Sequence, residues 1–231
     1  MRDILAGNSV EAALYEALQR YTEEDFHDIT YHDGTFYAVG SESLLMTSKD
    51  GLSWTTQHLQ VKHKLLHTIA FTGPKTGVIG GEKGTLLITD DNGATWRQKK
   101  APSERSIYDI TTSPIFPNAF TFVGSYGLWG YCSSISDNCN RSRNESYRYR
   151  AAALDKDQSQ KRGINIIAVG DDSHIDRITG VPGEALVTPL WERGRSNVTA
   201  MAFADRELPL LPKSSRGTLG LIAAGNGSVF R

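Results

Sequence analysis

The sequence predicts an all-β protein: a β-propeller of about five four-stranded blades, the fifth incomplete, with a short N-terminal α-helix. One turn sequence occurs twice, at Thr89–Trp96 and, in a looser copy, at Thr47–Trp54. Each copy ends in a tryptophan, and the two tryptophans lie 42 residues apart. A repeat of about 40 residues is typical of propeller blades, so the spacing indicates the fold class.

A strand with alternating apolar and polar residues opens each repeat. Its clear copies are Phe26–Thr30, Leu66–Ala70, Ile107–Thr111 and Val198–Ala202, and a weaker start falls near Arg150. An apolar strand that ends in glycine follows each start, and these glycines are Gly40, Gly80, Gly124, Gly170 and Gly225. The markers predict blades that start near residues 26, 66, 107, 150 and 198.

We expect residues 1–25 to form an extension with a helix and residues 26–231 to form the propeller. Asn8 and Glu11 have the spacing of a capping box. The apolar residues of this helix follow at near-fourfold spacing, as Val10, Leu14, Leu18 and Tyr21. We expect the helix to lie on the propeller and not inside it. Two hypotheses address the incomplete fifth repeat: a strand at residues 2–6 closes the ring, or the chain is a fragment or an open propeller that a partner completes.

The repeated turn is suited to satisfying its own backbone. Asp91 is placed to accept hydrogen bonds from turn amides, and Gly93 permits a positive φ. Thr89 and Thr95 flank the turn, and Trp96 is expected to be a buried staple. The first copy has Lys49 at the acidic position, and its corresponding residues are Asp50, Gly51, Ser53 and Trp54.

These residues form the pattern S/T-x-D-x-G-x-T-W, which resembles the Asp-box of sialidase-type BNR repeats. Together with the run from Gly77 to Thr89, the chain resembles the photosystem II stability/assembly factor-like propellers. The resemblance covers about residues 26–100. It implies a β-propeller that serves as a scaffold for a partner protein. A glycan-binding or adhesin-type propeller, or a degraded glycosidase, is the alternative.

Composition limits the partners. The net charge is −1, so no global field drives the chain onto nucleic acid, and we expect no nucleic-acid partner. No apolar run approaches the roughly 18 residues that a membrane helix needs, and the sequence does not indicate a compartment or an oligomeric state. Cys132 and Cys139 lack the paired spacing of a zinc site; we favour free thiols over a disulfide that closes a small loop.

The sequence argues against an enzyme. A sialidase needs an arginine cluster that an Arg-Ile-Pro or Arg-Leu-Pro motif announces, and the nearest string here is Arg177-Ile178-Thr179. His63 and His67 lie four residues apart, but His27 and His67 occupy the same position in two repeats, which the repetition of the fold explains. We therefore expect no catalytic residues, no metal and no cofactor.

A basic segment between the third and fourth repeats is the candidate partner site. Residues 141–162 contain seven basic and three acidic residues. The candidate partner-binding residues are Arg141, Arg143, Tyr147, Arg148, Tyr149 and Arg150, since arginine and tyrosine are enriched at interface hot spots. The alternative is a solvated insertion. A second place to search is the set of connections near Glu42, Glu82 and Tyr126.

Overall fold

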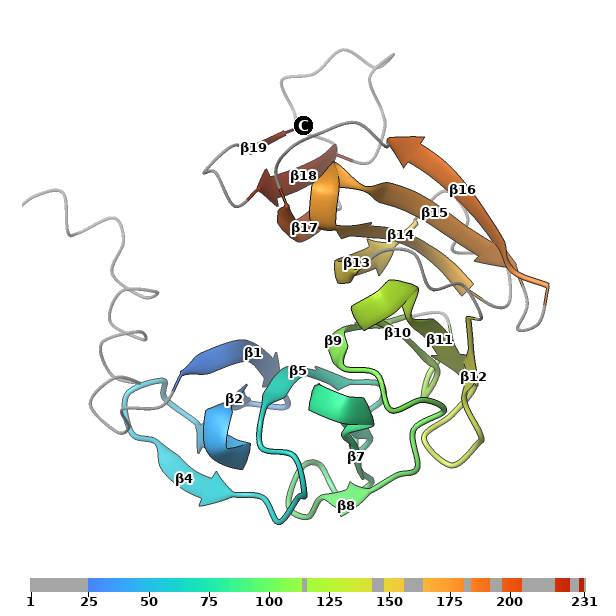
Figure 1. Cartoon of the computed structure of the whole chain (residues 1–231). Helices are drawn as coiled ribbons and strands as arrows, with labels where there is room; N and C mark the ends of the chain where they lie inside the picture. Colours follow the sequence, from blue (N-terminus) through green and yellow to red (C-terminus); the bar gives the residue numbers. More distant parts are fainter. Residues whose placement is uncertain are drawn as a thin grey trace, which may run out of the picture.

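The computed structural model describes residues 25–113, 116–142, 148–155, 164–180, 184–191, 197–204, 219–224 and 229–230. These residues form antiparallel sheets, four with four strands and one with three, arranged in an arc around a common centre (Figure 1). The expectation of an all-β, propeller-like protein is confirmed. The expected N-terminal helix and the strand at residues 2–6 lie outside the described residues.

Each sheet follows chain order from the centre outward. The first sheet contains β1 (Phe26–His32), β2 (Thr35–Gly40), β3 (Leu44–Ser48) and β4 (Thr55–His58). The second contains β5 (Leu66–Phe71), β6 (Gly77–Gly81), β7 (Leu86–Thr89) and β8 (Arg97–Gln98). The third contains β9 (Ile107–Thr112), β10 (Phe120–Gly124), β11 (Trp129–Cys132) and β12 (Asn140–Arg141).

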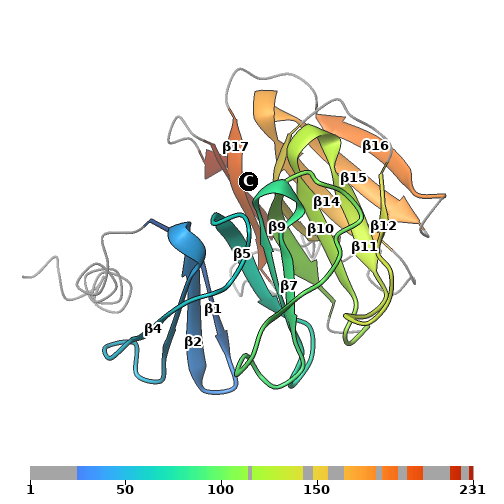
Figure 2. The same cartoon turned by 60° about the horizontal axis from the view of Figure 1, so that its bottom comes forward.

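The fourth sheet contains β13 (Tyr149–Leu154), β14 (Ile164–Gly170), β15 (Ile175–Gly180) and β16 (Leu186–Trp191). The fifth contains β17 (Val198–Ala204), β18 (Leu219–Ala224) and β19 (Val229–Phe230). The inner strands β1, β5, β9, β13 and β17 contact one another in that order around the centre (Figure 1). Figure 2 shows the sheets standing side by side.

Apolar side chains fill the spaces between neighbouring sheets. The first and second sheets meet through Tyr37, Val39, Leu45, Leu66, Ile79 and Leu87. The second and third meet through Val78, Leu86, Ile88, Ile107, Phe120 and Phe122. The third and fourth meet through Val123, Trp129, Tyr149, Ile164 and Ile166. Because full burial of a side chain of this size contributes about 1.5–3 kcal/mol, these seams supply much of the folding free energy.

The glycine before each of four 3₁₀ turns allows a close backbone contact. The turns are η1 (Ser41–Ser43), η2 (Glu82–Gly84), η3 (Ser125–Gly127) and η5 (Asp171–Ser173), and the glycines are Gly40, Gly81, Gly124 and Gly170. A Cβ on Gly124 would lie 1.9 Å from the Ser106 carbonyl oxygen, and the other three clash in the same way. Since all four backbones are extended, the missing Cβ, not the dihedral angle, explains glycine here. In the second repeat the equivalent glycine is Gly81, one residue after the sequence marker Gly80.

Both Asp-box turns hold their own backbone. In the second sheet, the Asp91 carboxylate accepts from the Thr89 hydroxyl at 2.7 Å and from the Thr95 amide at 2.9 Å. In the first sheet, Asp50 accepts from the Leu52 and Ser53 amides at 2.8 and 2.7 Å. The Thr95 hydroxyl also donates to Asp91 and is the largest cause of the lowered pKa there. Together these hydrogen bonds lower the pKa of both carboxyl groups to about 2.

The two tryptophans differ in burial. The Trp54 indole donates to the Gly51 carbonyl at 3.1 Å, and the side chain is buried, with 7% exposed. Trp96 is only partly buried; it packs against the core between the first two sheets, near Phe71. Trp54 is therefore the more deeply buried staple.

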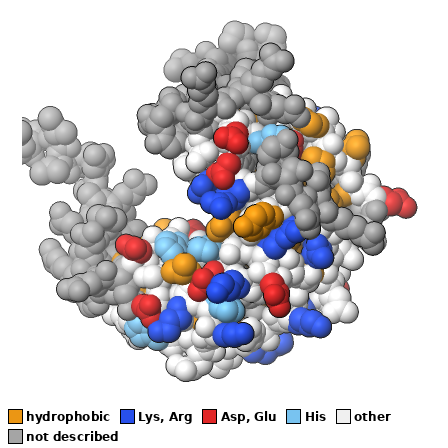
Figure 3. Space-filling view, in the orientation of Figure 1, with side chains coloured by type: hydrophobic (Ala, Val, Ile, Leu, Met, Phe, Trp, Pro, Cys, Tyr) orange, Lys and Arg blue, Asp and Glu red, His pale blue; other side chains and the backbone are white. Residues whose placement is uncertain are grey.

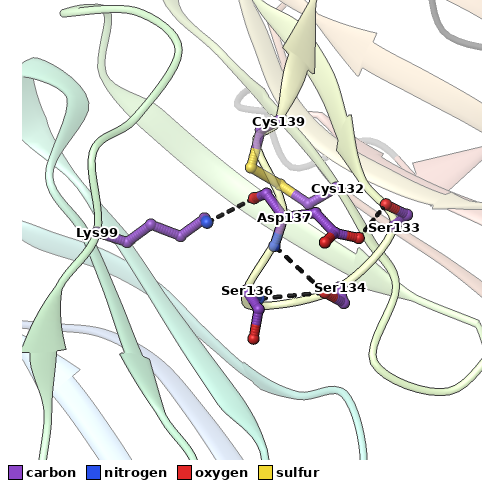
Figure 4. The surroundings of a disulfide bond; sticks show 7 residues. All are labelled: Lys99, Cys132, Ser133, Ser134, Ser136, Asp137 and Cys139. Carbon is purple, nitrogen blue, oxygen red and sulfur yellow. Dashed lines mark hydrogen bonds between the residues drawn. A yellow bond between two sulfur atoms is a disulfide. The ribbon is translucent and has the colours of Figure 1, made fainter.

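A disulfide between Cys132 and Cys139 closes the corresponding turn of the third sheet (Figure 4). The preference for free thiols was wrong: the hairpin brings the two Cα atoms to 4.3 Å, and the spacing alone did not reveal this. Inside the loop, the Ser133 hydroxyl donates to the Asp137 carboxylate at 2.6 Å. Lys99 of the second sheet donates to the Asp137 carbonyl at 2.6 Å, so the loop also joins two sheets.

We expect Trp54→Ala to lower the free energy of unfolding by about 3–5 kcal/mol, as loss of a buried aromatic ring does. Trp96→Ala should cost less, because its ring is only partly buried. Guanidinium denaturation of both variants checks the order. Equal losses would contradict the assignment of Trp54 as the more deeply buried staple.

Gly124→Ala should lower stability by about 3 kcal/mol or more, because the new methyl group meets backbone that cannot move alone. Gly34→Ala is the control: it has a positive φ but no atom within 4 Å of the new Cβ. It should cost only about 1 kcal/mol. Thermal unfolding measures both, and a loss at Gly124 no larger than that at Gly34 would refute the close-contact explanation.

Candidate functional site

A β-bulge near the start of every inner strand places one side chain at the same end of the sheets. In each strand the pairing skips one residue: Phe26 pairs with Gly40 and Asp28 with Val39, which leaves His27 unpaired. The bulged residues are His27, His67, Tyr108, Arg150 and Thr199, which we call the bulge ring. Bulges re-aim side chains and are over-represented next to functional sites.

The first three members of the bulge ring contact one another. The ring centroids of His27 and His67 are 5.4 Å apart, and those of His67 and Tyr108 are 5.1 Å apart. His27 Nδ1 donates to the Leu66 carbonyl at 2.7 Å, which fixes the orientation of its ring. Burial, together with the neighbouring His27, lowers the pKa of His67 to about 4. His67 is therefore neutral at neutral pH and presents an uncharged imidazole.

The fourth member is a cation held by a carboxylate. Arg150 Nε donates to Asp171 Oδ1 at 2.6 Å, and Arg148 Nε lies 3.7 Å from Asp171 Oδ2. Asp171 belongs to η5, so the turn fixes the direction of the Arg150 side chain. In Figure 3, histidine, basic and acidic side chains gather on this face around the hollow between the sheets.

The 3₁₀ turns lie at the end of the sheets where the inner strands begin, since each turn hydrogen-bonds to the residue that precedes an inner strand. The first amide of each turn donates to the carbonyl of the residue just before the inner strand, for example Ser125 to Ser106 at 3.0 Å. The central residue of each turn has φ between 47° and 54°: Glu42, Lys83, Tyr126 and Asp172. Non-glycine residues in this region are uncommon and cluster at ligand sites.

Tyr126 is the most prominent side chain of these turns. It is 65% exposed, and the Arg105 guanidinium lies 5.9 Å from its ring centroid. Arg105 Nη1 also donates to the Tyr126 carbonyl at 2.8 Å. An exposed aromatic ring next to a cation is suited to contact with a ligand.

Two carboxylates join neighbouring inner strands below the bulge ring. Asp28 accepts from the Ile69 amide of β5 at 2.8 Å, and Asp109 accepts from the Ala152 amide of β13 at 2.7 Å. Burial, assisted by the charge of Asp28, raises the pKa of Asp109 to about 6, although the Ala152 amide opposes the shift. Burial also raises the pKa of Asp28. The nearby Thr68 hydroxyl opposes the rise in the pKa of both carboxyl groups.

The structure separates the residues that the sequence grouped as a partner patch. Arg141 lies on the outermost strand of the third sheet, whereas Arg148 and Arg150 lie at the start of the innermost strand of the fourth. Tyr149 is 4% exposed and donates to Asp176, so its ring belongs to the core and is not available as a surface contact. Alternation along β13 buries Tyr149 between the two arginines, which sequence composition did not reveal. Arg143 and Tyr147 lie outside the described residues.

The sequence did contain the signal for the bulge ring. His27, His67, Tyr108 and Thr199 occupy the second position of the strand starts in the sequence, and His27 and His67 repeat the same residue type; Arg150 falls on the weaker fourth start itself. We attributed this repetition to the fold alone and did not extend the comparison to Tyr108 and Arg150. Within the described ranges, no group of three or more His, Cys, Asp or Glu side chains could hold a metal ion. No helix in the described part of the chain is long and apolar enough to cross a membrane.

Four-stranded antiparallel sheets around a centre, two of them with Asp-box turns, define a BNR-repeat β-propeller. Residues 8–101 match the family described as photosynthesis system II assembly factor YCF48. The resemblance expected from the sequence is confirmed over these residues. No match was found among curated proteins.

Solved structures share the fold. A structure of YCF48 bound to D1 peptide is 18% identical, with a TM-score of 0.64, over 90% of this chain and 64% of that one. YCF48 from Cyanidioschyzon merolae is 15% identical, with a TM-score of 0.61, over 89% of this chain and 68% of that one. A virginiamycin B lyase from Staphylococcus aureus is 10% identical, with a TM-score of 0.64, over 89% of this chain and 68% of that one. The chain thus spans about two thirds of the length of each.

We expect Asp109 to make wild-type stability fall as pH rises from about 4 to about 6, because its folded pKa lies above the unfolded value of 3.8. Asp109→Asn removes this titration and should flatten the slope in that window. Guanidinium denaturation at several pH values measures this slope. The slope is the readout because the substitution also alters the hydrogen bond to Ala152, which shifts the stability itself at every pH.

Asp91→Asn is the control, since its lowered pKa of about 2 places its effect at acidic pH. Its stabilising contribution is present above about pH 4 and is lost as pH falls toward 2. Parallel slopes for wild type and Asp109→Asn between pH 4 and pH 6 would contradict the assignment.

Proposed function

We propose that this chain is a non-catalytic β-propeller scaffold, with its five sheets as blades, that binds a peptide segment of a partner protein on the face with the bulge ring. The observation that carries the proposal is the ring itself: each inner strand turns one side chain toward this face, and the side chains differ in chemistry. Repetition of the fold explains the bulge at this position. It does not explain why the bulged residues carry two imidazoles (His27 and His67), a phenol (Tyr108) and a guanidinium (Arg150).

The chemistry of the ring suits an extended peptide. His27, His67 and Tyr108 form a row of ring contacts slightly more than 5 Å apart, which offers flat surfaces and polar edges. Arg150 lies near the start of β13, Tyr126 is exposed in η3, and both residue types are enriched at hot spots. The similar structure of YCF48 bound to D1 peptide supports a peptide as the class of ligand.

The partly buried carboxylates Asp28 and Asp109 support a binding role over catalysis. Asp28 and Asp109 each accept two backbone amides, at 2.7–2.8 Å. Lone pairs committed to the backbone hold strands in place and are less able to transfer a proton to a ligand. The likeness to a lyase propeller concerns the fold and adds no catalytic group here.

The test begins with selection of random dodecapeptides displayed on phage against the full chain. Affinities of selected peptides are then measured by fluorescence anisotropy. Tyr108→Ala and Arg150→Gln should each weaken binding about tenfold or more, as loss of a hot-spot side chain does.

The matched controls lie off this face. Tyr31→Ala removes an exposed tyrosine at the other end of β1, and Arg97→Gln removes an arginine ion-paired to Asp90 on an outer strand. Both should leave affinity within about twofold of wild type. Selected peptides that bind the ring variants and wild type equally would refute the peptide site. Glycan-array binding that Tyr108→Ala abolishes would favour the glycan-binding alternative.

A further inference from the structure

A cavity of about 340 Å³ lies in the first sheet, between the turn η1 and the loop that leads from β4 to β5. Glu42 and Ser43 of the turn line it, together with residues 58–61 and Lys64. The Ser43 carbonyl accepts from the Leu59 amide at 2.9 Å, and the Ser43 amide donates to the Lys64 carbonyl at 2.7 Å. The loop is thus anchored to Ser43 at both ends, which fixes the shape of the cavity. Its volume lies at the lower end of the range of about 300–1,000 Å³ for small-molecule sites.

Ser43 occupies a position that favours glycine. Its φ is 64°, and the corresponding residues of the second and third sheets are Gly84 and Gly127. A Cβ on Gly84 would lie 2.2 Å from the Ser103 carbonyl oxygen, in the loop that leads to β9. In the first sheet the corresponding loop leaves room for the Ser43 side chain and for the cavity beside it. A non-glycine residue in the left-handed region is strained, so serine carries a cost here that glycine would avoid.

The Ser43 hydroxyl makes no hydrogen bond to any residue that the structure describes, although only 3% of the residue is exposed. A buried hydroxyl without a partner is unfavourable, because it has lost its hydrogen bonds to water. Water in the cavity would satisfy the hydroxyl, but it would not account for a strained serine where two other sheets have glycine. A bound molecule that pairs with the hydroxyl accounts for both, since strain of this kind clusters at ligand sites.

The other groups around the cavity are suited to a neutral ligand that carries hydroxyl groups. Glu42 pairs with the Lys64 ammonium through Oε2, which balances its charge and leaves Oε1 as an acceptor. Gln60 is exposed, and its amide group can both donate and accept. Leu59, which is 7% exposed, and the partly buried Val61 form the apolar part of the wall.

We propose that this cavity binds a single neutral sugar unit. Sugar hydroxyls both donate and accept hydrogen bonds, which suits the Ser43 hydroxyl, the Gln60 amide and the Glu42 carboxylate. The C–H face of a sugar ring suits the apolar wall. The paired charges of Glu42 and Lys64 do not favour an ion of either sign. No member of the bulge ring lines the cavity, so this inference does not rest on the proposed peptide binding.

Saturation-transfer difference NMR on the full chain tests the site with methyl glycosides of glucose, galactose, mannose and N-acetylglucosamine. At least one should bind with a Kd of about 1 mM, as expected for so small a ligand. Ser43→Gly should weaken this binding about tenfold or more, because the hydroxyl is lost. The same variant should raise the Tm by about 2–4 °C, because glycine relieves the strained backbone. A serine that the fold itself requires would not give this gain in stability.

Ser173→Gly is the matched control. Ser173 has the same position in η5 and a φ of 57°, but it does not line this cavity. This variant should leave the affinity for the glycoside within about twofold of wild type. Failure of wild type to bind any of the four glycosides overturns the proposal, as does equal binding by wild type and Ser43→Gly. Binding of free glutamine or inorganic phosphate instead of the glycosides, lost in Ser43→Gly, overturns it in favour of a charged ligand. A lower Tm for Ser43→Gly also overturns it, because the fold would then require the serine.

Discussion

The fold depends on a backbone contact that glycine alone permits. At the junction between the second strand and the 3₁₀ turn, the chain passes very close to the carbonyl group that precedes the inner strand. A Cβ at this position would lie about 2 Å from the carbonyl oxygen in the first, third and fourth sheets, and 2.4 Å from it in the second. The amide that follows donates to the same carbonyl in all four sheets. This contact ties the turn to the inner strand, and the bulge follows from it because the next residues must rejoin the sheet ladder after a skipped position. The geometry of the candidate binding face is thus fixed by backbone atoms, and its side chains are left free to vary.

This division separates the residues that hold the fold from those that define its chemistry. Among the positions next to the bulge, Leu66, Ile107, Tyr149 and Val198 are buried, and the carboxylates Asp28 and Asp109 hold neighbouring inner strands together. The bulged residues are not part of the apolar clusters between the first four sheets, although His27, His67 and Tyr108 contact one another across neighbouring inner strands. His27, Tyr108 and Arg150 share a backbone position but no chemistry, which is the pattern expected where ligand contact, not packing, selects the residue.

The sequence predicted the fold class and the strand starts well, because both rest on local patterns. The alternation of apolar and polar residues indicated the strands that start at Phe26, Leu66 and Ile107, and the Asp-box pattern indicated the outer hairpins. Prediction from the sequence failed where the result depends on distances between residues in the folded structure. The Cys132–Cys139 spacing is compatible with free or bonded thiols, and only the hairpin geometry decides. Tyr149 looked like an interface residue by composition, yet strand alternation places it in the core between two surface arginines. The bulge shifts the alternation by one position, and only comparison of the repeats, not the pattern within a single strand, points to the shared position.

The decay of the Asp-box along the chain has a structural counterpart. In the first two sheets, a carboxylate and a tryptophan hold the outer turn. In the third, the disulfide and the Ser133–Asp137 hydrogen bond hold the same turn, and Lys99 reaches it from the second sheet. The outer turn needs an interaction that holds its two strand ends together, and the carboxylate hydrogen bonds, the tryptophan and the disulfide can each provide it. The outer rim can therefore lose its sequence signature without losing its architecture. The inner end of each sheet cannot lose its sequence signature, because no other residue is small enough to replace glycine at the close backbone contact. This explains why the glycine marker is still present in the fourth sheet, where the tryptophan motif is no longer complete.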